Sequence, residues 1–256
     1  MDLDLKGKIA VVTGSSRGIG RSIALGLGEE GCHVSLCARG EEALLATEKE
    51  VRALDVETLA TSADLTGAEG INQVIQATLD KWGRIDILVN NVGGSKWTAF
   101  EDVSDEEWLD IFDWNMFAAV RATRAALPSM KAQGSGSIIT ISSIFGRESG
   151  GPATYNATKA AEISMGKTLA KELAKTGIRV NTVAPGSVIF PGGNWQKRLD
   201  ADPEGINKFV EQEIPCGRFG TPEEIANVVV FLSSNRASWV TGACINVDGC
   251  QSRSLI

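Results

Sequence analysis

Residues 13–20 read Thr13-Gly14-Ser15-Ser16-Arg17-Gly18-Ile19-Gly20, and this stretch decides the fold. An apolar run at 9–12 precedes it, and an amphipathic stretch follows it. Glycines at this spacing permit a tight turn and let backbone amides approach a pyrophosphate, and the N-terminus of a following helix adds free N–H groups. The loop therefore predicts dinucleotide binding. The chain has no G-x-x-x-x-G-K-[ST] sequence, which disfavours a P-loop NTPase.

Short β-branched runs alternate with amphipathic stretches along the whole chain. Seven of these runs are expected to be strands: 9–12, 33–37, 58–61, 85–89, 137–141, 179–183 and 244–247. Nearly continuous apolar strands suit a parallel sheet that is covered on both faces. The expected fold class is α/β, a doubly wound, parallel, seven-stranded sheet with helices on both faces, of Rossmann type. Because the 256 residues contain no linker and no repeat, they are expected to form a single domain, 1–256.

The composition excludes several classes of function. A formal net charge of −7 argues against general binding of nucleic acid or of an anionic membrane surface. No apolar run approaches the roughly 18–20 residues of a membrane span, and the acidic start of the chain does not resemble a signal peptide. The five cysteines include no C-x-x-C pair, and His33 is the single histidine, so no metal site is expected. These features predict a cytoplasmic protein with reduced thiols.

The end of the second expected strand indicates which dinucleotide binds. An NAD-binding loop usually places a carboxylate there for the ribose hydroxyls, whereas this chain has Ala38 and Arg39. A carboxylate would repel a 2′-phosphate, and a guanidinium can bind one in fork geometry. Arg17 could close on the same phosphate. The alternative is two solvated surface arginines, but their coincidence at these sites predicts NADP(H).

The single tyrosine, Tyr155, stands four residues before Lys159, so the two would share one face of a helix. Carbonyl reduction needs a proton donor at oxygen while hydride arrives at carbon, and a nearby ammonium lowers the pKa of a phenol. Ser142, at the end of the fifth expected strand, can donate a hydrogen bond to the same oxygen. A structural tyrosine packed on a helix is the alternative interpretation.

Together these motifs closely resemble the short-chain dehydrogenase/reductase family from Lys8 to Gly249. The resemblance rests on 13–20, Asp64-Leu65, Asn90-Asn91-Val92-Gly93, Asn115, Ser142, Tyr155 with Lys159, Pro185-Gly186 and Asp248-Gly249. It implies a catalytic set in which Tyr155 is the general acid/base, Lys159 tunes it, Ser142 polarises the substrate oxygen and Asn115 supports a proton-relay water. It also implies cofactor contacts from Gly14, Ser16, Arg17, Gly18, Ile19, Gly20, Arg39, Asp64, Leu65, Asn91, Gly93, Tyr155, Lys159, Pro185, Gly186 and Val188.

The chain departs from the family pattern at three positions. Val92 replaces the usual alanine, Phe190 stands where a threonine often contacts the carboxamide, and Cys250 replaces a final glycine. Phe190 suggests a more apolar pocket. Residues 187–220, with a helical patch near 205–213, are expected to form a substrate-binding lid, although a surface insertion is the alternative. The predicted substrate pocket comprises Trp97, Ser142, Ile144, Phe190 and Trp195.

The expected reaction interconverts a ketone of small or medium size and a secondary alcohol. Enoyl reductases of the superfamily usually place six residues between tyrosine and lysine, whereas this chain has three. A 3-oxoacyl-[acyl-carrier-protein] reductase is the alternative, since the length and residues 217–224 are similar. Arginines often flank the cleft of such reductases. At two positions where they often occur, this chain has Gln133 and Thr176. A non-catalytic NADP(H)-binding regulator is a remote third possibility. By resemblance, a homotetramer is expected.

Overall fold

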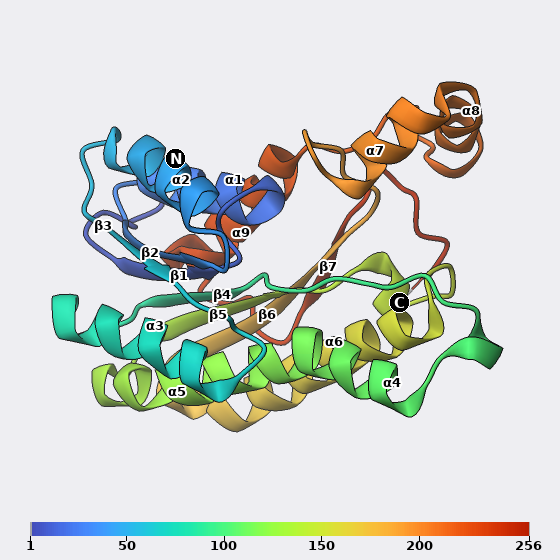
Figure 1. Ribbon diagram of the computed structural model, residues 1–256. Helices are drawn as coiled ribbons and strands as arrows, with labels where there is room; N and C mark the ends of the chain where they lie inside the picture. The colour runs from blue at the N-terminus through green and yellow to red at the C-terminus, as the bar shows by residue number, and fades with distance from the viewer. Residues whose placement is uncertain (1, 256) are drawn as a thin grey trace.

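The computed structural model describes residues 2–255 and contains a seven-stranded parallel sheet with helices on both faces (Figure 1). The strands are β1 (Ile9–Thr13), β2 (His33–Ala38), β3 (Thr58–Ser62), β4 (Ile87–Asn90), β5 (Gly136–Ile141), β6 (Ile178–Pro185) and β7 (Cys244–Val247). Their order across the sheet is β3-β2-β1-β4-β5-β6-β7, and all neighbours are parallel. This arrangement confirms the predicted fold class, with strand ends that differ by up to two residues.

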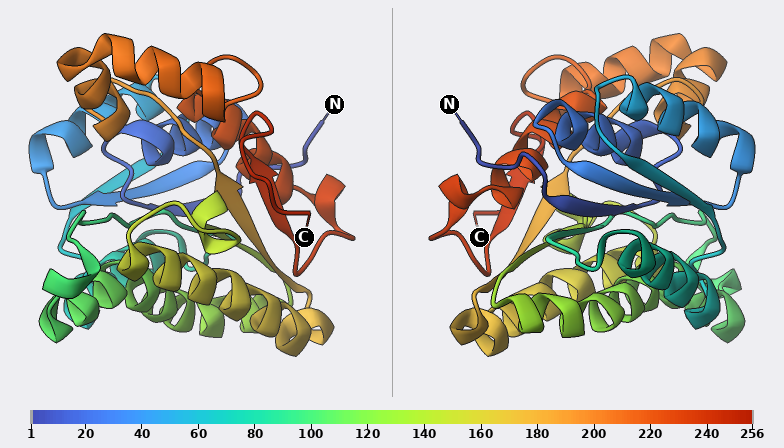
Figure 2. Two further views of the ribbon diagram at one scale, coloured as in Figure 1. Left: turned by 90° about the vertical axis from the view of Figure 1, so that its right-hand side faces the viewer. Right: turned by 90° about the vertical axis from the view of Figure 1, so that its left-hand side faces the viewer.

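Two layers of helices sandwich the sheet (Figures 1 and 2). One layer holds α1 (Gly18–Glu29), α2 (Glu41–Arg52) and α9 (Pro222–Ser233), and the other holds α3 (Ala68–Trp82), α5 (Ala118–Gln133) and α6 (Ala153–Leu173). Successive side chains of a strand point to opposite faces. Val12 of β1 therefore belongs to the core beneath α1 and α9, whereas its neighbour Val11 belongs to the core beneath α3 and α5.

The sheet reverses its winding between β1 and β4. The chain moves outward from β1 to β2 and β3, and then returns to place β4 on the other side of β1. Loops that leave adjacent strands in opposite directions open a crevice at the carboxyl ends of those strands, where doubly wound folds bind ligands. The glycine loop at 13–20 follows β1 at that point.

The helical region over 105–133 is interrupted. It consists of α4 (Asp105–Phe112), a π-helical turn η2 (Asp113–Phe117) and α5. Short 3-10 turns lie elsewhere: η1 (Phe100–Asp102), η3 (Ile144–Gly146), η4 (Ala174–Thr176) and η5 (Asn235–Ala237). Single π-turns inside helices often accompany functional sites. Within residues 2–255, no helix is long and apolar enough to cross a membrane.

The segment 187–220 holds two helices where the sequence predicted one. These are α7 (Asn194–Ala201) and α8 (Pro203–Glu213), and they overhang the carboxyl edge of the sheet (Figure 1). The helical run breaks at Asp202, whose carboxylate accepts a 2.9 Å hydrogen bond from the Gly205 N–H, with Pro203 at the first position of α8. An acidic cap followed by proline starts a new helix.

Candidate active site

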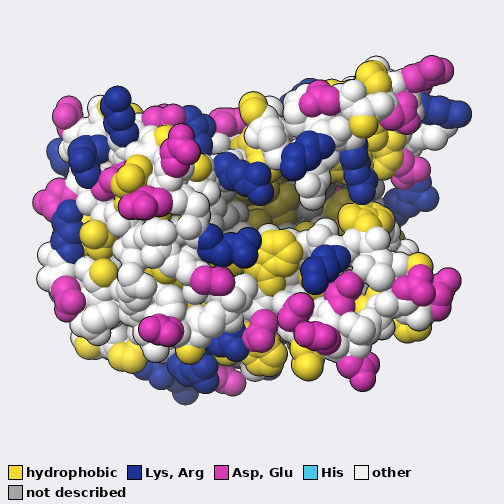
Figure 3. Space-filling model, viewed as in Figure 1, with side chains coloured by type: hydrophobic (Ala, Val, Ile, Leu, Met, Phe, Trp, Pro, Cys, Tyr) yellow, Lys and Arg dark blue, Asp and Glu magenta, His cyan; other side chains and the backbone are white. Residues whose placement is uncertain are grey.

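Two connected cavities lie at the carboxyl edge of the sheet. The larger is a cleft of about 720 Å³ between the glycine loop and the ends of β2 to β6, and a pocket of about 150 Å³ adjoins it beneath α7. Figure 3 shows the hollow on one face of the molecule, with Lys and Arg side chains around its mouth. Tyr155 lines both cavities. A reaction between a molecule in the cleft and one in the pocket would therefore occur beside this phenol.

The glycine loop is shaped to hold an anion. Gly14 and Gly18 have φ of +67° and +54°, in the left-handed region that favours glycine. A Cβ on Gly20 would collide with the Gly14 carbonyl oxygen, so only glycine lets α1 start this close to the loop. The Asn91 amide donates hydrogen bonds of 2.9 and 3.1 Å to the Thr13 and Gly14 carbonyls. With no acidic residue in its first turn, α1 points a positive N-terminus at the cleft, which fits a pyrophosphate.

The predicted phosphate-binding arginines both line the cleft. The Arg39 guanidinium lies 6.0 Å from the centroid of the Trp114 ring, and Arg17 Nη1 lies 3.5 Å from the Gly192 carbonyl oxygen. Within residues 2–255, neither guanidinium forms an ion pair with a carboxylate. Both therefore remain available to an anionic group.

The other predicted cofactor residues gather along the same cleft. Asp64 and Leu65 follow β3, and the Thr66 backbone N–H holds the pKa of the Asp64 carboxyl below its ordinary value, with a smaller contribution from Arg39. Residues that line the cleft also include Ser16, Ile19, Asn91, Gly93, Pro185, Gly186 and Val188. Gly18 differs: it lies against the Phe190 ring, and a Cβ there would come within 2.6 Å of that ring.

Three of the four predicted catalytic residues meet at the start of α6. Lys159 Nζ lies 5.7 Å from the centroid of the Tyr155 ring and donates a 3.0 Å hydrogen bond to the Ile141 carbonyl. Ser142, at the end of β5, donates a 2.8 Å hydrogen bond to the Lys159 carbonyl. The four-residue spacing on α6 thus places the ammonium beside the phenol, where a positive charge favours phenolate.

Asn115, the fourth predicted residue, lies buried in the π-turn η2. Its amide accepts a 3.0 Å hydrogen bond from the Gly94 N–H and donates to the carbonyls of Gly94 and Ile111 at 3.0 and 2.8 Å. A Cβ on Gly93 would lie 2.5 Å from Asn115 Oδ1. The side chain therefore holds the strand end that forms the cleft floor, and both of its amide hydrogens are donated to backbone oxygens.

Sequence reasoning missed Glu162. Its carboxylate oxygens lie 3.1 and 2.9 Å from Lys159 Nζ, and both side chains are buried. Burial opposes the charge on Lys159, but the adjacent carboxylate outweighs it and raises the pKa of the ammonium. Burial also raises the pKa of the Glu162 carboxyl, and Lys159 opposes that change. The available signal was the spacing, because residues three apart on a helix are neighbours.

The smaller pocket brings together Trp97, Ile144 and Trp195 as predicted candidates. It also contains Arg198, which the sequence did not single out: its guanidinium lies 4.9 Å from the Trp97 ring centroid and 5.2 Å from that of Trp195. Of the other two candidates, Phe190 packs on the glycine loop and lines the cleft, and Ser142 lies at the cleft floor. The pocket is therefore walled by indole rings and a cation.

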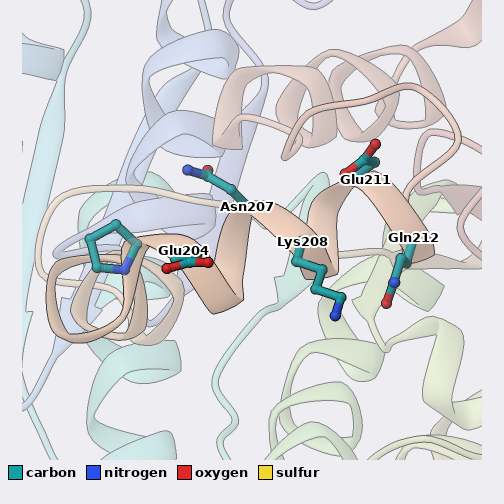
Figure 4. A pocket seen from close by; sticks show the side chains of 6 residues that line it. Glu204, Asn207, Lys208, Glu211 and Gln212 are labelled. Atoms are coloured by element: carbon teal, nitrogen blue, oxygen red, sulfur yellow. The ribbon is translucent and has the colours of Figure 1, made fainter.

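A further concavity, of about 810 Å³, is not part of this site. Figure 4 shows it on the outer side of α8, lined by six exposed residues: Pro203, Glu204, Asn207, Lys208, Glu211 and Gln212. Side chains of a single solvated helix converge on no common point, so this surface has no feature of a binding site. Residues 2–255 contain no cluster of three or more His, Cys, Asp or Glu side chains that could hold a metal ion.

Comparison with known proteins finds similarity over nearly the whole chain. A family model described as enoyl-(acyl carrier protein) reductase matches residues 14–250. The 3-oxoacyl-[acyl-carrier-protein] reductase of Staphylococcus aureus is 38% identical over 244 residues, which are 94% of this chain and 97% of that protein. L-sorbose reductase from Gluconobacter frateurii, solved with NADPH and L-sorbose, has a TM-score of 0.94 at 35% identity and full coverage of both chains. A 7α-hydroxysteroid dehydrogenase solved with NADH and a 7-oxo bile acid has a TM-score of 0.91 at 30% identity, covering 100% and 98%.

Proposed function

The chain belongs to the short-chain dehydrogenase/reductase family, and we infer from this and from the site that it is an NADP(H)-dependent oxidoreductase. It interconverts a ketone and a secondary alcohol, with Tyr155 as the general acid/base. The observation that carries the proposal is the position of Tyr155, which lies on the boundary between cleft and pocket with the Lys159 ammonium 5.7 Å from its ring.

The residues of this site have different roles in carbonyl reduction. The bound cofactor supplies hydride to the carbonyl carbon. Tyr155 donates its phenolic proton to the carbonyl oxygen, and Lys159 stabilises the phenolate that remains. Ser142 turns its hydroxyl from the Lys159 carbonyl toward the same oxygen as negative charge develops there. Because the side-chain hydrogens of Asn115 are already donated, a proton-relay water would be held by its backbone carbonyl.

NADP(H) is the proposed cofactor because of Arg17 and Arg39. Solved relatives include one complex with NADPH and one with NADH, so membership of the family leaves the choice open. In this chain two unpaired guanidinium groups line the cleft where a 2′-phosphate would lie, and Ala38 stands where a carboxylate would exclude it.

A 3-oxoacyl-[acyl-carrier-protein] reductase is the second candidate, and the Staphylococcus aureus relative favours it. The net charge of −7 speaks against an acidic carrier protein as partner. Gln133 and Thr176 do not bear on the choice, because the structure does not place them beside the cleft. These two residues lie at the ends of α5 and η4, beside the starts of β5 and β6, and so at the opposite edge of the sheet from the cleft of the same chain. We propose a small-molecule ketone as the substrate. The three residues between Tyr155 and Lys159, where enoyl reductases usually have six, disfavour enoyl reduction.

The partners and location proposed for the protein follow from the same features. Nucleic acid and membranes are not proposed as partners, because the net charge is −7. Burial raises the pKa of the Cys32 and Cys37 thiols to about 12, so these thiols stay protonated and inert. Free thiols and a nicotinamide cofactor suit the cytoplasm.

Replacement of Tyr155 by phenylalanine tests the proposed function. NADPH oxidation is first screened across cyclic ketones, ketoacids, sugars, steroids and 3-oxoacyl thioesters to find a substrate. Tyr155→Phe is then expected to reduce turnover by at least the roughly 10²–10⁴-fold typical of general acid–base catalysis. NADPH binding, measured by fluorescence, should be nearly unchanged because the ring is retained. A variant that keeps more than about a tenth of wild-type turnover would refute the role of Tyr155.

A further inference from the structure

A buried carboxylate touches the catalytic pair but takes no part in the steps above. Glu162 is 1% exposed and Lys159 is 3% exposed, and both Glu162 oxygens lie within hydrogen-bond distance of the ammonium. Burial raises the pKa of the Glu162 carboxyl, and Lys159 and the Ser142 hydroxyl oppose that change. Removing two charges from water commonly offsets their attraction, so stability alone does not account for this pair.

The charged groups near the Lys159–Glu162 pair come from several elements. On α6 itself the charged partner of Lys159 is Glu162. Uncharged groups face the pair from β5 and η2, namely Ser142 and the Asn115 amide beside Gly93. The remaining charged side chains of the two cavities come from other elements: Arg17, Arg39, Asp64 and Arg198. Of these, Arg39 lies over Trp114, and Arg198 lies over Trp97 and Trp195.

From this geometry we infer that Glu162 is a positioning residue, which acts on Tyr155 through Lys159 and weakens the effect of the ammonium on the phenol. A lone ammonium strongly favours phenolate, whereas an ammonium paired with a carboxylate presents a dipole, whose field falls off faster with distance. A protonated phenol is ready to donate to a ketone but not to accept from an alcohol. The pair thus biases the site toward ketone reduction. This inference rests on the proposed role of Tyr155 as proton donor.

The single tyrosine of the chain makes a direct test possible. Ionisation of a phenol changes its ultraviolet absorbance, and here that change reports on Tyr155 alone, with Tyr155→Phe as the blank. In the purified full-length protein, the wild-type phenol is expected to ionise at a higher pH than the phenol of Glu162→Gln. Ionisation of the wild-type phenol at the same or a lower pH than in Glu162→Gln overturns the inference. No substrate is involved, so that result would leave the proposed reaction, tested by turnover, untouched.

Two substitutions separate charge from shape at position 162. Glu162→Gln keeps the hydrogen-bonding atoms but removes the charge, so the phenol should titrate about one unit lower. The pH at which alcohol oxidation reaches half its maximal rate should fall by the same amount. Glu162→Asp retains the charge and should restore titration toward the wild-type value. An unchanged or raised titration in Glu162→Gln overturns the inference, and if that variant does not fold, Glu162→Ala, which also removes the charge, decides by the same comparison.

Discussion

At the scale of single residues, cofactor preference depends on Arg39. The Arg39→Asp variant is expected to lose the charge-assisted hydrogen bonds to a 2′-phosphate and to add repulsion. Such hydrogen bonds contribute about 1.5–3 kcal/mol each, so kcat/KM with NADPH should fall by at least about tenfold. As the control, kcat/KM with NADH is measured on the same variant and should be retained. A wild-type enzyme that prefers NADH tenfold would contradict the assignment.

Substitutions of Lys159 and of Ser142 are expected to differ in their effects on turnover and on NADPH binding. Lys159→Met should reduce turnover and also weaken NADPH binding, because the ammonium serves both the phenol and the cofactor ribose. Ser142→Ala should lower kcat by roughly 10²–10³-fold, as expected for the loss of one oxyanion donor, with cofactor affinity nearly intact. Stopped-flow turnover and NADPH fluorescence titration distinguish the two patterns. Equal losses of cofactor affinity in both variants would contradict this division.

At the scale of elements, the segment 187–220 is proposed to act as a lid. Its two ends are held together, because Ile189 N–H donates to the Gly220 carbonyl and Gly220 N–H donates to the Ser187 carbonyl, both at 3.0 Å. Within it, the Trp195 ring stacks on Phe209 at 4.7 Å and contacts Phe219 at 5.1 Å between centroids. The α7–α8 unit can therefore move as one body about the two paired backbone segments at its ends, residues 187–189 and Gly220.

Trp195 connects this lid to the substrate pocket. Trp195→Ala is expected to raise KM for a ketone by about tenfold, equivalent to about 1.4 kcal/mol, because an aromatic wall of the pocket is lost. Phe100, which is 72% exposed and lies outside the lid, gives the control variant Phe100→Ala. Unchanged KM and kcat in Trp195→Ala for every substrate found would refute the lid.

The start of α9 carries a pH-dependent cap. Arg218 and the Thr221 backbone N–H hold the pKa of the Glu224 carboxyl at about 2, below its ordinary 4.5. A lowered pKa stabilises the folded state above the ordinary value and loses this effect as pH falls toward the folded value. After allowance for solvent exposure, Glu224→Ala should lower the free energy of unfolding by about 1 kcal/mol at pH 7.

The difference in stability between wild type and Glu224→Ala should also depend on pH. The gap in melting temperature between wild type and Glu224→Ala should shrink between about pH 5 and pH 2, because the wild-type carboxylate becomes protonated over that range. Differential scanning calorimetry measures it, with Glu211→Ala on exposed α8 as the control. A gap that widens in acid would contradict the prediction.

At the scale of the whole molecule, a homotetramer is predicted by family resemblance. The large exposed apolar side chains include Leu109 and Phe117, near one predicted interface of α4, α5 and α6, and Phe231 and Trp239, near the other predicted interface of α9 and β7. Sedimentation velocity should show a tetramer at micromolar concentration. Leu109→Asp and Trp239→Asp should each weaken one interface and yield smaller species, and a wild-type monomer would contradict the prediction.

The sequence alone determined the sheet, the glycine loop and the Tyr155–Lys159 spacing. These features are local: strand hydrophobicity, backbone freedom at Gly14 and Gly18, and helical periodicity all act over a few residues. Only the tertiary structure decided which side chains meet across the chain. It placed Arg198 between Trp97 and Trp195, packed Phe190 on the glycine loop, and buried Glu162 against Lys159. The first two contacts depend on packing between distant segments. The Lys159–Glu162 pair is local in sequence, but its burial depends on the segments that cover it.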